Sequence, residues 1–191
     1  MTRGKTTNPV LGFDYRLKPF TPKITELPDQ TMVELDVVGD PNTETSRLMG
    51  PLYATAYGVR KRYKNEGQVF KVEKLRGRWP EQIRLADKST WRGRYGLPVP
   101  NDTDSLPPIK KEKAIPGVEP QLNTWHYGLV GQILHVGPYD QEPPAIDKLL
   151  VFVQEQGYEV IEGSHEEVYL SDPGKTEPEK MKTIIMYRLK R

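Results

Sequence analysis

The sequence contains no cysteine among its 191 residues. This absence excludes disulfide bonds, thiolate metal sites and a cysteine nucleophile, and it is typical of a reducing compartment. Histidine is scarce, with three residues, so a histidine-rich metal site is not expected. No apolar run approaches the roughly 18 residues of a membrane-spanning helix, and no apolar segment follows the first residues as it would in a secretory signal. We therefore expect a cytoplasmic protein without metal, cofactor or membrane span.

The charge balance shows no strong excess of one sign. The chain has 28 Lys and Arg against 26 Asp and Glu, for a net charge of +2, so the molecule as a whole has no bias toward nucleic acid. Hydrophobic residues make up 36% and charged residues 28%, which is typical of a folded, rather polar domain. The length predicts one domain or two fused halves of similar fold.

The 18 prolines lie mostly outside the periodic segments. Residues 1–30 are interpreted as an irregular arm with a short edge strand near residues 23–26. Residues 98–123 are interpreted as a linker that proline stiffens. The segments between and after them, residues 31–97 and 124–191, carry the periodic patterns of regular structure.

Both segments predict the order β-α-β-β. In the first, residues 31–38 alternate as a strand, a helix with Pro51 at a kink or restart follows, and strands are expected at 68–75, 83–85 and 89–95. In the second, residues 124–136 form the strongest strand pattern, an apolar stripe predicts a helix around residues 146–153, and strands are expected at 158–161, 165–170 and 182–189. Val38-Gly39 before the first helix matches Val136-Gly137 before the second, and Gly67 matches Gly157 after them. These matches indicate a duplicated fold.

The strand around residue 167 carries the first candidate functional group. Glu167 and Tyr169 alternate with Val168 and Leu170, so the carboxylate and the phenol share one face. A carboxylate beside aromatic rings binds cations, or acts as a general base if burial raises its pKa. The alternative is a solvated strand glutamate. Glu166 points to the opposite face and is interpreted as structural or exposed.

Several motifs resemble the GyrI-like (gyrase-inhibitor-like) small-molecule-binding domains, and in particular their stand-alone, full-length subfamily. They are His135-Val136-Gly137-Pro138-Tyr139-Asp140, Gly157-Tyr158-Glu159, the run Glu166 to Pro173, and Gly39-Asp40-Pro41-Asn42 with Trp79 after Arg76-Gly77-Arg78. The resemblance covers roughly residues 20–191. It implies an α+β fold of two βαββ halves with pseudo-two-fold symmetry, in which helices cover one face of a mixed, mostly antiparallel sheet. A ligand cleft would lie between the halves on the other face.

The resemblance also implies a function, and the sequence departs from the family pattern in the last strand. Members bind bulky, often cationic or aromatic organic molecules, some regulate transcription, one type protects gyrase, and a few stand-alone members hydrolyse cyclopropane-bearing alkylating natural products. Many members carry a glutamate in the last strand, where this chain has Thr183-Ile184-Ile185. The acidic function is then expected to rest on Glu167.

Aromatic residues supply candidate walls for a ligand site. Flat rings stack on an aromatic or cationic ligand at small entropic cost, and the alternative for each is core or turn packing. Trp125 and Tyr95 add aromatic surface. The residues expected to bind the ligand with Glu167 are Trp79, Tyr53, Tyr57, Trp91, Tyr139 and Tyr169.

Residues 60–94 form a basic patch with twelve Lys and Arg against four Asp and Glu. Such a patch with interleaved aromatics can bind phosphates, although a solvated helix end explains it more simply.

Three hypotheses for the function of the protein stay open. The protein binds a hydrophobic, aromatic small molecule, or it is a hydrolase in which Glu167 activates water with Tyr169 nearby, or it is a nucleic-acid or gyrase accessory protein that uses the patch.

Overall fold

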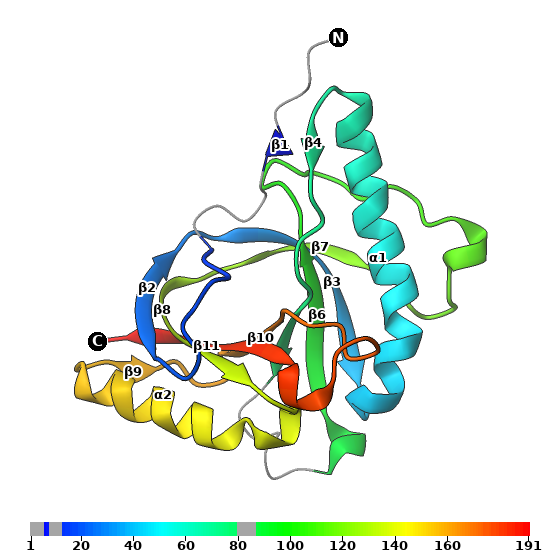
Figure 1. Ribbon diagram of the computed structural model, residues 1–191. Coiled ribbons are helices and arrows are strands. Elements are labelled where there is room, and N and C mark those ends of the chain that lie inside the picture. The colour runs from blue at the N-terminus through cyan, green and yellow to red at the C-terminus, as the bar shows by residue number, and fades with distance from the viewer. Residues whose placement is uncertain (1–5, 8–12, 80–86) are drawn as a thin grey trace. The chain divides into compact units, whose positions relative to one another are not determined.

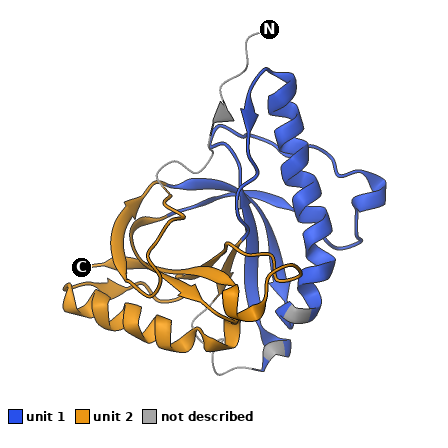
Figure 2. Ribbon diagram, in the orientation of Figure 1, with its two compact units in different colours: residues 1–11, 29–75, 85–126 blue, residues 12–28, 76–84, 127–191 orange. Residues whose placement is uncertain are grey.

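The computed structural model describes residues 6–7, 13–79 and 87–191. Contacts divide the chain into two compact units (Figure 2). Unit 1 comprises Met1–Leu11, Asp29–Leu75 and Leu85–His126, and unit 2 comprises Gly12–Pro28, Arg76–Arg84 and Tyr127–Arg191. Residues 98–123 lie within unit 1, and each unit is built from segments that are far apart in the sequence. In the described part of the chain, no helix is both long and apolar enough to cross a membrane.

Unit 1 packs one long helix on an antiparallel sheet (Figure 1). Strand β3 (Gln30–Val38) pairs with β6 (Arg92–Pro98) on one side and with β7 (Gln121–Trp125) on the other. Helix α1 (Pro41–Asn65) continues through Pro51 without a restart, because Gly50 before the proline has no Cβ to meet its ring. An apolar stripe at helical spacing, Leu48, Leu52, Ala56 and Val59, is buried against the sheet side of the unit's core.

Short elements complete unit 1. A parallel pair joins β1 (Thr6–Thr7) and β4 (Val69–Phe70), and single 3-10 turns form at η2 (Lys88–Thr90) and η3 (Lys111–Lys113). The predicted strand over 68–75 is therefore wrong beyond Phe70, since residues 71–75 adopt no regular structure. The strand expected at 83–85 lies outside the described residues.

Unit 2 contains five antiparallel strands in the order β2-β8-β11-β10-β5, with β9 paired to the end of β11. The expected edge strand in the arm is β2, and it pairs with β8 across more than 100 positions in the sequence. The bounds are β2 (Lys23–Leu27), β5 (Arg76–Trp79), β8 (Gly128–Val136), β9 (Glu159–Val160), β10 (His165–Tyr169) and β11 (Lys182–Lys190).

Helix α2 (Pro143–Glu155) covers one face of this sheet. Its stripe of Ile146, Leu149 and Val153 packs against Ile133 and Ile185. The 3-10 turn η4 (Tyr139–Gln141) leads into α2, and η5 (Pro178–Lys180) leads into β11. We call the opposite side of the sheet the far face. It carries the strand residues that alternate with the α2 contacts, namely Val130, Gln132 and Leu134 of β8, Ile184, Met186 and Arg188 of β11, Glu166 and Val168 of β10, and Arg76 and Arg78 of β5.

The expected fold class is confirmed. The chain is α+β, each unit combines one helix with antiparallel strands, and the order β-α-β-β occurs twice. One predicted strand is wrong, because residues 124–136 do not run as a single strand. The ladder is interrupted at His126 and Tyr127, and Gly128 takes a positive φ of 69° at the start of β8.

Candidate functional site

Strand β10 carries one polar cluster on each face of the sheet. Its register places Glu167 opposite Ile185, which packs against α2, and Glu166 opposite Met186 of the far face. The predicted alternation along this strand is therefore correct. The expectation that Glu167 points to the helix-free side of the sheet is wrong, because Glu167 shares the side that α2 covers. Glu166 is the carboxylate of the far face.

On the α2 side, a buried carboxylate pairs with an imidazole. Glu167 Oε1 lies 2.9 Å from His165 Nε2, and His165 Nδ1 lies 2.8 Å from the hydroxyl of Tyr187. The side chains of His165 and Glu167 are 10% and 15% exposed. Both imidazole nitrogens are thus engaged, which fixes the ring between the carboxylate and the phenol.

The surroundings of Glu167 favour its ionised form. Burial alone would raise the pKa of this carboxyl, but the hydrogen bond and charge of His165, with the hydrogen bond of Tyr169, outweigh burial and hold the pKa below its usual value. The carboxylate is therefore ionised at neutral pH, and a lowered pKa makes it a weaker base than a burial-raised pKa would.

Three aromatic residues predicted for the ligand site meet beside Glu167. The indole Nε1 of Trp79 donates to the hydroxyl of Tyr169 at 3.0 Å, and the Tyr169 ring meets the edge of Tyr139 at a centroid distance of 5.8 Å. Gly77 makes this contact possible, since a Cβ at that position would lie 2.6 Å from both the Trp79 nitrogen and the Tyr169 oxygen. Sequence reasoning thus selected residues that do converge, on the α2 side of unit 2.

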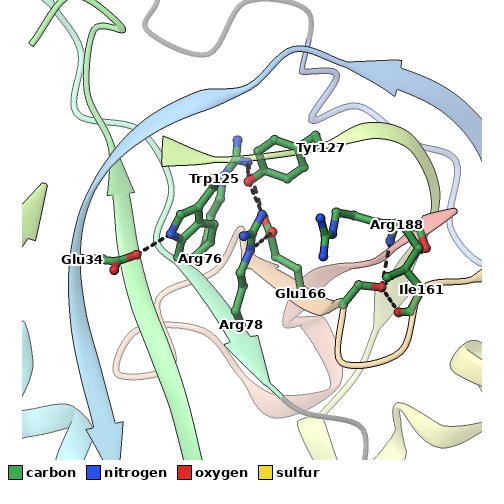
Figure 3. A network of polar contacts seen from close by, with 9 residues as sticks. Glu34, Arg76, Arg78, Trp125, Tyr127, Ile161, Glu166 and Arg188 are labelled. Carbon is green, nitrogen blue, oxygen red and sulfur yellow. Dashed lines mark hydrogen bonds and ion pairs between the residues drawn. The ribbon is translucent and has the colours of Figure 1, made fainter. Parts of the chain in front are cut away.

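The other predicted ligand residues belong to unit 1. Tyr53 and Tyr57 stack on α1 with centroids 6.5 Å apart, and Tyr57 is 54% exposed. Trp91 is half-buried just before β6. In unit 1, Trp125 donates its indole N–H to the buried Glu34, at 2.5 Å (Figure 3).

The far face of unit 2 holds a buried network that the sequence reasoning missed (Figure 3). Tyr127 donates its hydroxyl to Glu166 Oε1 at 2.8 Å and accepts from Arg76 Nη1 at 2.6 Å. Arg78 Nε donates to Glu166 Oε2 at 2.9 Å, while Arg76 Nη1 lies 3.4 Å from Glu166 Oε1. Glu166 is 2% exposed and Arg76 1% exposed, so of the two interpretations of Glu166, structural or exposed, the structural one is correct.

Aromatic rings enclose the Arg76 guanidinium. Its central carbon lies 4.6 Å from the Phe13 ring centroid and 5.6 Å from that of Tyr127. Burial works to lower the pKa of Arg76, but Tyr127 and Glu166 outweigh it and raise the pKa. Burial is also the main cause that raises the pKa of Tyr127, which stays protonated and donates to Glu166.

The internal repeat could have revealed this network. Gly67 and Gly157 match at an offset of 90 positions, and the same offset carries Arg76 onto Glu166. Strands β5 and β10 pair antiparallel, with Arg78 opposite Glu166 and Arg76 opposite Val168. Because β5 and β10 pair with each other, Arg76 and Glu166 are diagonal neighbours on one face of the sheet. An arginine and a glutamate at such positions indicate a buried ion pair.

The arginines of the basic patch are largely engaged within the chain. Arg60 donates to the carbonyl of Phe70 at 3.0 Å, and Arg62 donates to Ser105 at 2.9 Å. Arg76 and Arg78 bind Glu166. These groups are therefore not arranged as a free surface for phosphates, and residues 80–86 of the patch lie outside the described part. Among residues 6–7, 13–79 and 87–191, no group of three or more His, Asp or Glu side chains is arranged to hold a metal ion.

Comparison with known proteins identifies the family of this chain and solved structures with the same fold. A model of the family described as GyrI-like small molecule binding domain matches residues 20–190. An uncharacterized conserved protein from Listeria innocua is 26% identical, with a TM-score of 0.75 over 90% of this chain and 93% of that one. A hydrolase from Listeria innocua is 24% identical, with a TM-score of 0.73 over 92% of this chain and 95% of that one. The EcmrR C-terminal domain is 14% identical, with a TM-score of 0.58 over 90% of this chain and 98% of that one. No curated protein matched the sequence.

Proposed function

Because the chain belongs to the GyrI-like small molecule binding domain family, we propose that it binds a hydrophobic, aromatic organic molecule on the far face of unit 2. The family match over nearly the whole chain carries this proposal. The far face adds an apolar strip of Val168, Ile184 and Met186 beside Glu166. Each of these side chains is at most 2% exposed, so a ligand reaches them only when the side chains that cover them move. Mostly apolar surface with a few convergent polar groups is typical of small-molecule sites.

A panel of uncharged aromatic compounds tests this proposal. Saturable binding is measured by equilibrium dialysis and by the rise in unfolding temperature that a ligand of the folded state produces. Met186→Ala removes apolar contact from the far face and is expected to weaken binding about fivefold or more. Met49→Ala, in α1 of unit 1, is the matched control. Equal affinities of the two variants, once both are shown to be folded, would place the ligand elsewhere.

A second candidate function is hydrolysis of strained, cyclopropane-bearing electrophiles. The observation that favours it is the ionised Glu167 held by His165 and Tyr187. In this reaction the Glu167 carboxylate takes a proton from water, the water oxygen bonds to a ring carbon, and the strained carbon–carbon bond breaks. The electron pair of that bond goes to the electron-accepting part of the substrate.

Incubation with a cyclopropane-bearing alkylator, followed by mass spectrometry for the hydrated product, tests the second candidate. Glu167→Gln keeps the shape of the side chain and loses the base, so turnover should fall about 100-fold or more. Glu162→Gln, at an exposed position, should keep wild-type turnover. Turnover that survives in Glu167→Gln would remove the hydrolase from consideration and leave binding alone.

A further inference from the structure

Helix α2 turns its outer side away from the sheet of unit 2 (Figure 1), and this side carries a groove. The groove has a volume of about 440 Å³ and is lined by Pro22 of the arm and by Asp147, Lys148, Val151, Phe152 and Glu155 of α2. Val151 lies in the middle of the groove-lining part of the helix and is 56% exposed. The groove is therefore an apolar surface, edged by charges, that is open to a partner.

The exposed side of α2 has the residue spacing of a helix-pairing seam. Pro144, Lys148, Val151 and Glu155 are all exposed and follow one another at intervals of four, three and four residues. Residues at this spacing lie on one side of a helix, and two helices pack against each other along such a stripe. The outer side of α2 thus has the form of a second packing face, opposite to the one that covers the sheet.

The charges on this stripe are self-complementary. Lys148 and Glu155 lie equally far, by three and a half residues, on either side of the midpoint between Val151 and Phe152. A second copy of α2 that packs antiparallel about a two-fold axis at this midpoint places its Glu155 beside Lys148 and its Lys148 beside Glu155. In the described part of the chain, neither Lys148 nor Glu155 forms an ion pair, so both can pair across such an interface.

The same charges disfavour the competing arrangements of two α2 helices. A parallel pair would set Lys148 of one copy against Lys148 of the other, and like charges side by side repel. An antiparallel pair shifted by one residue, with its axis at Val151, would set Asp147 against Glu155 of the second copy. The charge pattern therefore selects one orientation and one register.

We propose that the outer side of α2 is a self-association surface whose partner is a second copy of this chain. In this dimer the two α2 helices pack antiparallel, and Val151 and Phe152 of each copy cover the groove of the other. Two Lys148–Glu155 pairs lie on either side of this apolar centre. One helix face is small compared with the interface of a stable dimer, so we expect a weak association with a dissociation constant on the order of 100 µM.

Sedimentation equilibrium of the full chain, from about 5 µM to about 1 mM, tests this inference. The average mass should rise from that of the monomer toward that of the dimer, and added salt should weaken the association. A chain that stays monomeric over the whole range overturns the proposal. If the monomeric chain instead binds the apolar dye anilinonaphthalenesulfonate saturably, and Val151→Asp abolishes this binding, the groove is a small-molecule site and the dimer is likewise overturned.

Charge reversal tests the register. Lys148→Glu and Glu155→Lys each replace two attractive pairs by two repulsive ones, so each should weaken dimerisation about tenfold or more. The double variant restores both pairs in the opposite sense and should return to within about threefold of the wild type. Lys61→Glu, at an exposed position of α1 in unit 1, is the matched control and should dimerise as the wild type does. Equal dimerisation of Lys148→Glu and Lys61→Glu, or no recovery in the double variant, would place the interface elsewhere and overturn the proposal.

Discussion

Among the single residues of unit 2, Glu166 is the one whose loss we expect to destabilise the fold most. It compensates two arginines and accepts the hydroxyl of Tyr127. Glu166→Gln leaves the Arg76 charge buried without a counterion, and removing one partner of a buried pair costs about 3 kcal/mol or more. Urea unfolding followed by circular dichroism measures this loss.

The matched control is Glu159→Gln. Glu159 pairs with Lys190 at 3.3 Å, but the two side chains are 73% and 58% exposed. Exposed pairs contribute little, so this variant should stay within about 0.5 kcal/mol of the wild type. Similar losses in the two variants would show that the Glu166 network adds no more stability than a surface pair.

The pH dependence of stability should report the environment of Glu167. His165 and its neighbours hold the pKa of this carboxyl below its ordinary value of 4.5. The unfolded chain therefore takes up the proton at a higher pH than the folded chain. The stability that Glu167 contributes is present above about pH 4.5 and is lost as the pH falls through the folded pKa.

Comparing wild type with Glu167→Gln tests this sign. The wild type should be the more stable protein at neutral pH, and the difference in the free energy of unfolding should shrink as the pH is lowered from about 7 to 3. Glu162→Gln should show no such pH-dependent difference. A gap that widens toward acid would mean that the pKa of Glu167 is raised in the folded state.

The two glutamates of β10 show what sequence can and cannot predict for single residues. Alternation correctly separated Glu166 from Glu167, because successive side chains of a strand point to opposite faces. It could not tell which face α2 covers, since that depends on packing between distant segments. Trp79 was selected by family resemblance, and Tyr139 and Tyr169 as aromatic candidates for a ligand site. The three rings gather beside Glu167.

At the level of elements, β5 depends on the absence of a side chain at Gly77. A Cβ there would press against the Trp79 nitrogen and the Tyr169 oxygen, each at 2.6 Å. Gly77→Ala should therefore break the Trp79–Tyr169 hydrogen bond and cost about 1–3 kcal/mol through overpacking. Thermal unfolding by circular dichroism measures the cost. Gly174→Ala is the control, since a Cβ there meets only Asp172 Oδ1 at 3.4 Å. Equal unfolding temperatures for the two variants would mean that β5 can shift to make room.

Helices were easier to predict than strand boundaries. The stripes of α1 and α2 repeat over several turns, so each apolar position supports the others. The break between β7 and β8 left no mark in the pattern, because apolar residues continue on both sides of His126 and Tyr127. An interruption of two residues is a matter of backbone conformation, here next to the positive φ of Gly128.

For the whole molecule, the division into units follows contacts that the sequence order conceals. Unit 2 combines the β-α-β-β segment after residue 126 with β2 from the arm and β5 from the first repeat. Composition and periodicity show where elements lie but not which distant strand pairs with which. The predicted halves at 31–97 and 124–191 describe the repeat within one domain, and fragments can test whether a half folds by itself.

We expect the fragment of residues 124–191 not to fold by itself. It retains β8, β11 and β10 with α2, but it lacks β2 and β5, which pair with the two edges of that sheet. Both edges would be open to association with other chains, and Glu166 would be buried without Arg76 and Arg78. The fragment should show no cooperative urea transition and should aggregate as its concentration rises, as judged by circular dichroism and size-exclusion chromatography, with the full chain as control. A cooperative transition with the midpoint of the full chain would establish residues 124–191 as an autonomous half.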